Sequence, residues 1–202
     1  MDIKYILNSN NSVNWDNYKL FIDTLYHNKK SYYLKNINKS GNKYIYENYF
    51  KNEKLNPPYT NNELDILCKN AGGVKLPDIL YNYLTRVSKQ IFFYDNPGND
   101  FLLYQKIPKK IDLDNSNIPK SKTSIYSYDD NEESINTTFL NGFLTIGNNI
   151  GSCFIDYIYI GSGYYYDSIW SCDDEGVFMY DNKSIYDVMI SHFNRYNTKY
   201  NI

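Results

Sequence analysis

The last third of the chain constrains the fold most strongly, because short strand-like segments alternate there with glycines. Four segments are rich in β-branched and aromatic residues: 143–146, 152–160, 164–171 and 177–180. The links between them are short and contain glycine, which is typical of antiparallel hairpins. The pattern therefore predicts a meander in which strands that follow one another in sequence also pair.

A closing helix is predicted directly after the last of these segments. Ser184 and Asp187 have the spacing of a capping box, in which each side chain bonds to the backbone N–H of the other residue. Apolar residues then recur at helical spacing: Ile185, Val188, Met189, Phe193 and Tyr196. The predicted class is therefore α+β, with an antiparallel sheet of about four to six strands packed against helices and a C-terminal closing helix.

The N-terminal part of the chain contains a further helical pattern. Apolar residues at helical spacing predict a helix over about residues 14–27, with Asn14 as its cap. We expect residues 32–34 and 91–94 to be extended. The pattern of residues 44–50 fits a strand or a helix equally well.

Two more helices are predicted in the middle of the chain. One covers residues 61–70 and is ended by glycine, and the next begins at Pro77, a residue that suits the first helical position. We expect Leu80 and Leu84 to be buried where this second helix meets the sheet. Residues 108–136 contain few large aliphatic residues and predict a long surface loop, of the kind that is functional or partly disordered.

Two adjacent prolines after Asn56 suggest how the chain is divided. We expect an N-terminal helical extension, residues 1–55, packed on a main α+β domain, residues 56–202. A chain of 202 residues, 42% of them hydrophobic, is long enough to bury one sizeable core. The abundance of tyrosine, 24 residues against a single alanine, is explained by an AT-rich genome, so it does not by itself indicate function.

Charge and cysteine content limit the compartments and partners. The net charge is -2 and the pI is about 5.7, which argues against a nucleic-acid partner. No apolar run is long enough to cross a membrane, so no membrane partner is predicted. The chain has an odd number of cysteines, Cys68, Cys153 and Cys172, and no secretory signal, which favours reduced thiols in the cytoplasm.

Motifs that carry catalytic or cofactor chemistry are missing from the sequence. There is no GxSxG, HExxH, CxxC, GxGxxG or GxxxxGK[ST] pattern. His192 lies within the apolar stripe of the closing helix, which indicates a partly buried histidine rather than a ligand. We therefore predict no catalytic residue, no cofactor and no metal, and a protein that binds a partner rather than an enzyme.

One segment carries the residues that suit a binding surface. Tyr164, Tyr166 and Trp170 lie on one strand-like run, and tyrosine and tryptophan are frequent anchors at interfaces. The acidic residues Asp173, Asp174 and Glu175 follow and would form a rim for a basic partner. We predict that these six residues contact another protein.

Two other functions are consistent with the same residues. Exposed tyrosines also suit a carbohydrate-binding module. Paired carboxylates can hydrolyse a glycosidic bond or hold a divalent ion. Such carboxylates follow Pro108 in the long loop and recur after Trp170: Asp129, Asp130, Glu132, Glu133, Asp173, Asp174 and Glu175.

The order of these segments resembles the SUKH superfamily, which includes fungal cell-wall synthesis regulators, bacterial immunity proteins and proteins of large DNA viruses. The resemblance rests on residues 63–71, the segment Gly72-Gly73-Val74-Lys75-Leu76-Pro77, residues 80–84, and the later strand and helix pattern. It covers roughly residues 60–197, and the first 55 residues have no counterpart.

This resemblance implies a non-enzymatic module that recognises another protein, of immunity or inhibitor type against a toxin or host effector. The AT-rich composition fits a viral or microbial member, which in a viral case would act in the host cytoplasm. The family often has an asparagine-glycine pair soon after the second helix, whereas this chain has Val87-Ser88-Lys89-Gln90.

Overall fold

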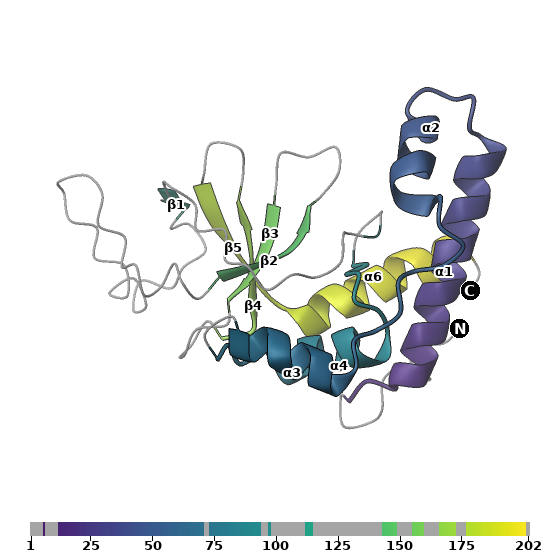
Figure 1. The fold of residues 1–202 in the computed structure, drawn as a ribbon. Coiled ribbons are helices and arrows are strands. Elements are labelled where there is room, and N and C mark those ends of the chain that lie inside the picture. Colours follow the sequence, from purple (N-terminus) through teal and green to yellow (C-terminus); the bar gives the residue numbers. More distant parts are fainter. Residues whose placement is uncertain are drawn as a thin grey trace. The chain divides into compact units, whose positions relative to one another are not determined.

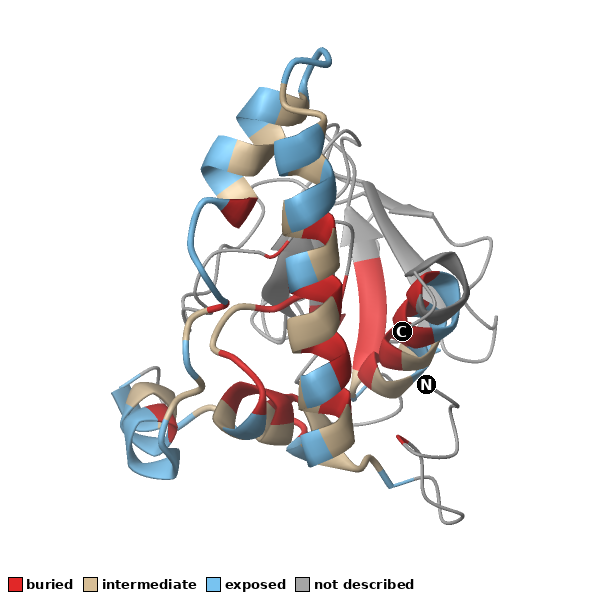
Figure 2. Ribbon diagram, turned by 90° about the vertical axis from the view of Figure 1, so that its right-hand side faces the viewer, coloured by how far each residue is buried: buried red, intermediate tan, exposed pale blue. Residues whose placement is uncertain are grey.

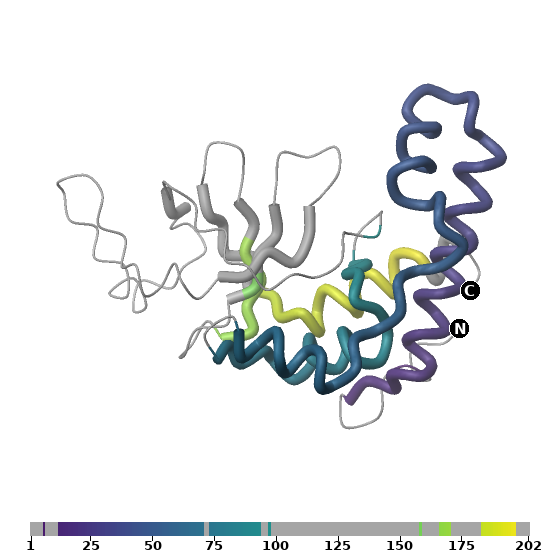
Figure 3. Tube along the Cα trace, viewed as in Figure 1, coloured from purple at the N-terminus to yellow at the C-terminus, as the bar shows by residue number. Residues whose placement is uncertain are grey.

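The computed structural model describes residues 6, 12–70, 73–93, 97, 112–114, 143–148, 155–159, 166–172 and 177–200. The chain forms two compact units that interleave along the sequence, and Figure 3 traces its path. The first unit contains Met1–Ile66, Asp78–Phe101 and Val188–Ile202, and the second contains Leu67–Pro77 and Leu102–Asp187. The expected division into residues 1–55 and 56–202 stays a prediction.

The first unit begins with helix α1, Trp15–Lys35 (Figure 1). As predicted, Asn14 is its N-cap, with a side-chain oxygen that accepts the backbone N–H of Asn17 at 3.1 Å. The helix is longer than predicted, so the expectation that residues 32–34 are extended is wrong. Tyr33 stacks on Phe50 with ring centroids 5.3 Å apart, and this distant partner supports the last turns. Figure 2 shows the buried residues of α1 along one side of the helix.

Two short helical segments pack on the C-terminal half of α1, as Figures 1 and 2 show. Helix α2 covers Asn42–Ile45, and the π-helical segment η2 covers Tyr46–Phe50, so residues 44–50 are helical. Gly41 precedes α2 with φ 79°, a conformation that costs glycine little. The hydroxyl of Tyr26 donates to the carbonyl of Asn52 at 3.1 Å and fixes the end of this pair of segments to α1.

Helix α3, Asn61–Asn70, has the predicted bounds. It opens with a capping box that the sequence reading overlooked, in which Thr60 Oγ1 accepts the N–H of Glu63 at 3.2 Å and Glu63 Oε2 accepts the N–H of Thr60 at 2.8 Å. The hydrogen bonds from Thr60 lower the pKa of Glu63. After α3, Gly73 has φ 77° and donates its N–H to the carbonyl of Cys68 at 3.0 Å, as expected of a glycine that ends a helix.

Helix α4 covers Asp78–Arg86, directly after Pro77. Leu80 and Leu84 are fully buried, which confirms the predicted burial of these two side chains. Tyr83 is buried on the same helix, and its ring packs edge-on against Tyr18 of α1 with centroids 6.2 Å apart. The N-terminal helix therefore packs directly on α4.

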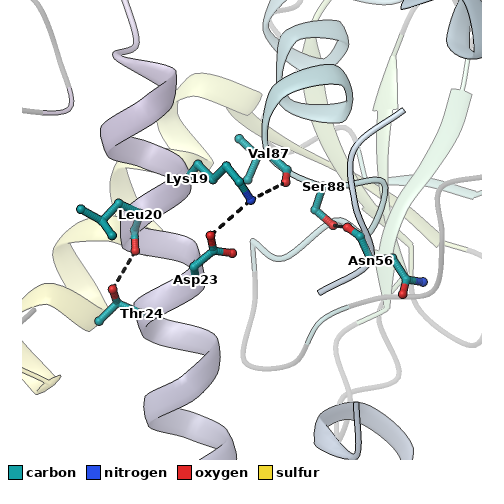
Figure 4. Close-up of polar contacts among 7 residues, drawn as sticks. All are labelled: Lys19, Leu20, Asp23, Thr24, Asn56, Val87 and Ser88. Carbon is teal, nitrogen blue, oxygen red and sulfur yellow. Dashed lines mark hydrogen bonds and ion pairs between the residues drawn. The ribbon is translucent and has the colours of Figure 1, made fainter. Parts of the chain in front are cut away.

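Polar contacts join α1, the segment after α4 and the chain near Asn56 (Figure 4). Lys19 Nζ donates to the carbonyl of Val87 at 3.3 Å and pairs with Asp23 at 3.2 Å. The buried hydroxyl of Ser88 donates to the carbonyl of Asn56 at 2.8 Å. These bonds pair backbone carbonyls that would otherwise be buried at a cost.

Residues 91–93 are not a strand, which corrects the prediction for this part of residues 91–94. The hydroxyl of Tyr83 donates to the carbonyl of Gln90 at 3.0 Å and accepts the N–H of Phe92 at 3.1 Å. A side chain thus pairs backbone groups that a neighbouring strand would pair in a sheet. The first unit buries three apolar residues of this segment in its core: Ile91, Phe92 and Phe93.

The strands of the second unit are β1 (Asp112–Asp114), β2 (Phe143–Asn148), β3 (Ile155–Tyr159), β4 (Ser168–Cys172) and β5 (Val177–Ser184). They are ordered β1-β5-β4-β3-β2. The pairs β2–β3, β3–β4 and β4–β5 are antiparallel, as the meander predicted. Strand β1 pairs with β5 in parallel, which corrects both the purely antiparallel sheet and the loop expected at residues 112–114.

Helix α6, Ile185–Tyr200, ends the described chain. The predicted capping box is confirmed: Asp187 Oδ2 accepts from the N–H of Ser184 at 2.9 Å, and Ser184 Oγ accepts from the N–H of Asp187 at 3.2 Å. The five predicted core residues of this helix are buried, and so is His192. The fold is therefore a mixture of helices and antiparallel strands with a C-terminal helix, as the sequence predicted.

Candidate functional site

The predicted contact residues fall partly outside the described chain. Tyr164, Asp173, Asp174 and Glu175 lie outside the described residues, as do Cys153 and the loop of residues 108–136 apart from β1. Tyr166 and Trp170 are described, and they differ sharply in exposure: 40% for Tyr166 and 0% for Trp170. The candidate site is therefore built around Tyr166.

Trp170 is a core residue, which corrects its prediction as a contact. Its indole N–H donates to Ser168 Oγ at 2.9 Å, so the polar atom of the ring is satisfied inside the protein. Ile169 is also fully buried and pairs across the strands with Ile158, another fully buried residue. Successive residues of a strand point to opposite faces, so β4 is covered on both faces at this point.

Tyr166 and Asp167 form a turn that precedes β4, so the predicted strand over residues 164–171 begins only at Ser168. Asp167 has φ 65° and is the one described non-glycine residue with a positive φ. Aspartate tolerates this left-handed region better than most residues, yet it still stores local strain. The turn redirects the chain, so that Tyr166 is exposed and Ser168 is buried.

The carboxyl group of Asp167 lies at the start of α6. Burial raises its pKa to about 6; a hydrogen bond from the backbone N–H of Ile185 opposes the rise, and the charge of Asp187 adds to it. One oxygen, Oδ1, is buried and accepts no hydrogen bond from the described residues. Asp167 is therefore partly protonated near pH 6, whereas ordinary aspartates are ionised there.

The β4–β5 pair is irregular beside this turn. Ser168 is opposite Ser184 and Trp170 is opposite Tyr180, so two steps along β4 correspond to four along β5. Such irregularities change the direction in which side chains point where regular strand pairing ends. The turn, the irregular pairing and the capping box of α6 meet within a few residues, and together they fix the backbone that carries Tyr166.

Asp167 is the residue of this site that the sequence reading missed. The available signal was its position, an aspartate between a tyrosine run and a β-branched strand, which is a favourable place for a left-handed turn residue. Its pKa could not have been predicted, because it depends on α6, which begins many residues later in the chain.

The chemistry open to this arrangement is narrow. The charge of Asp187 adds to the rise in the pKa of Asp167. The Asp187 carboxylate itself accepts two hydrogen bonds from Ser184 within the capping box. Across the described part of the chain, no three His, Cys, Asp or Glu side chains come close enough to hold a metal ion. The strongest feature is thus an exposed phenol on a strained, well-anchored turn.

Comparison of the chain with protein-family models, with curated proteins and with solved structures finds no match. Among the described helices, none is both long enough and apolar enough to span a bilayer.

Proposed function

We propose that this chain is a non-enzymatic protein-binding module of SUKH type, acting as an immunity-like or inhibitor-like protein in the cytoplasm. The observation that carries the proposal is the exposure of Tyr166 on a turn whose backbone is fixed by its neighbours. A rigid aromatic anchor loses little conformational entropy on binding, which favours affinity.

The acidic residues Asp173, Asp174 and Glu175 remain part of this proposal as a rim, together with Tyr164. They lie close in sequence to β4, whose first residue follows the Tyr166 turn. The Tyr166 turn therefore borders the proposed binding surface. Rim charges act mainly on the rate of association, and buried anchors act mainly on dissociation.

The experiment uses the partner that copurifies from the native host, identified by mass spectrometry. In surface plasmon resonance, Tyr166→Ala should speed dissociation, with a loss of about 2 kcal/mol if the ring is a central anchor. Replacing the acidic trio by Asn and Gln should slow association and flatten its salt dependence. Ile66→Ala is the control, because Ile66 is 48% exposed and lies outside the proposed surface.

Wild-type kinetics for both Tyr166→Ala and the trio variant would refute the proposed surface. Circular dichroism of each variant separates a binding defect from misfolding. The surface of Tyr164, Tyr166 and the acidic trio is then excluded even if the partner itself is correct.

A carboxylate-dependent hydrolase is the second candidate, because the pKa of Asp167 is raised to about 6, a value that suits a general acid. It predicts turnover of a glycan or phosphodiester substrate that Asp167→Asn abolishes. A carbohydrate-binding module instead predicts saturable glycan binding that Tyr166→Ala removes. If neither turnover nor glycan binding is seen while the protein partner binds, the proposed function stands.

A further inference from the structure

The segment of residues 30–54, here called the basic hairpin, differs in charge from the rest of the chain. It includes the end of α1, the link to α2, and α2 and η2 themselves. It contains six lysines and two glutamates, a net charge of +4 in a chain of net charge -2, so the other residues together carry -6.

Both glutamates of the basic hairpin face lysines within it. Glu53 pairs with Lys30 at 3.4 Å, and Glu47 lies 3.9 Å from Lys43. The remaining lysines, Lys35, Lys39, Lys51 and Lys54, are exposed, and no acidic side chain of the described residues pairs with them. The positive charge of this surface is therefore available to a partner.

Large apolar side chains are exposed on the same segment. Tyr32 is 48% exposed, Leu34 49% and Tyr44 60%. A soluble domain can leave single apolar residues exposed to water. Here three large apolar side chains lie within thirteen positions, among exposed lysines. Protein interfaces similarly have apolar contact residues surrounded by a polar rim.

The basic hairpin is held rigidly, so its surface is preformed. The Tyr33 ring stacks on Phe50, and Phe50 in turn packs on Tyr26 with centroids 5.3 Å apart. Lys30 Nζ donates to the carbonyl of Asn52 at 2.8 Å, which ties the end of the segment back to α1. A preformed surface loses less conformational entropy on binding.

We propose that the basic hairpin docks an acidic segment of a protein partner that also carries apolar side chains. The net charge of -6 elsewhere on the chain would repel a long polyanion such as a nucleic acid or an anionic membrane, whereas a short acidic segment meets only the local positive charge. The basic hairpin also has no arginine, the residue best suited to bidentate hydrogen bonds with phosphate. The basic hairpin belongs to the first unit, whereas the Tyr166 turn belongs to the second.

The test is fluorescence anisotropy of the full chain with a short labelled peptide in which glutamate alternates with leucine. Parallel probes are a lysine–leucine peptide of the same length, a single-stranded oligothymidylate and vesicles that contain phosphatidylserine. The glutamate–leucine peptide should bind most tightly, and salt should weaken it. The double variant Lys35→Gln/Lys39→Gln should weaken binding roughly three- to tenfold, as expected for the loss of two exposed charge contacts.

The matched control is Lys69→Gln/Lys75→Gln, which removes the same charge from two exposed sites outside the basic hairpin. It should bind like the wild type. Tyr44→Ala should weaken peptide binding without changing the circular dichroism spectrum. The proposal is overturned if the two lysine pairs weaken binding equally, if oligothymidylate or vesicles bind more tightly than the peptide, or if the peptide does not bind.

Discussion

The ammonium nitrogen of Lys29 lies 4.3 Å from the centroid of the Tyr196 ring, inside the core of the first compact unit. Lys29 is only 3% exposed, and its ammonium is also 5.7 Å from the centroid of Phe92. Taking a charge out of water is costly unless it is compensated. The negative faces of aromatic rings compensate a desolvated cation, at about 2 kcal/mol for a good pair. The rings of Tyr196 and Phe92 therefore contribute to the stabilisation of the buried ammonium of Lys29.

Replacing Tyr196 tests this relationship. Tyr196→Phe keeps a ring face over Lys29, whereas Tyr196→Leu removes it, so we expect the leucine variant to lose about 2 kcal/mol more of unfolding free energy than the phenylalanine variant. Urea denaturation gives both values. In a Lys29→Met background the difference should shrink, because the charge is gone. Equal losses for the two variants in both backgrounds would show that the ring face is unimportant.

The raised pKa of Asp167 predicts a pH dependence of stability. An acid whose pKa is higher in the folded state than in the unfolded state binds more protons when folded. The ionisation of Asp167 therefore lowers the free energy of unfolding as the pH rises from about 4 to about 6. Asp167→Asn removes this ionisation and should stabilise the protein at about pH 8, on the order of 1 kcal/mol after allowing for solvent screening. The gain should fade near pH 4. Thermal melts at both pH values test this, and a gain that is larger in acid would contradict it.

Leu80 and Leu84 test the core of the first unit. Both are fully buried on α4, so truncation of either to Ala should cost about 2–5 kcal/mol. Leu20→Ala is the control, because Leu20 is 56% exposed and its truncation should change stability by less than about 0.5 kcal/mol. Chemical denaturation monitored by circular dichroism measures all three. A loss under about 1 kcal/mol at both buried sites would mean that α4 is packed differently.

The two capping boxes should contribute separately. Thr60→Ala and Ser184→Ala each remove an N-cap acceptor, so each should cost about 1 kcal/mol. Thr24→Ala is a matched control within α1, because the Thr24 hydroxyl donates only to the carbonyl of Leu20 in its own helix. Alanine favours a helix interior, so this change should be neutral or stabilising. If Thr24→Ala destabilises as much as the cap variants, the capping assignment fails.

Local signals were sufficient for part of this fold. The Asn14 cap, the box of Ser184 and Asp187, and the turn at Gly73 each involve residues within five positions of one another. Their hydrogen bonds form in the same way whatever the rest of the chain does, so the sequence alone predicts them. The buried stripes of α4 and α6 follow equally from helical spacing.

Tertiary partners decided the rest. Residues 32–34 are helical because Phe50 supports Tyr33, and residues 91–93 are not a strand because the Tyr83 hydroxyl pairs their backbone. Trp170 is buried because both faces of β4 are covered, and the pKa of Asp167 is raised because of burial beside α6. Each of these outcomes depends on groups distant in sequence, whose approach only folding brings about, so no local pattern of residues could specify them.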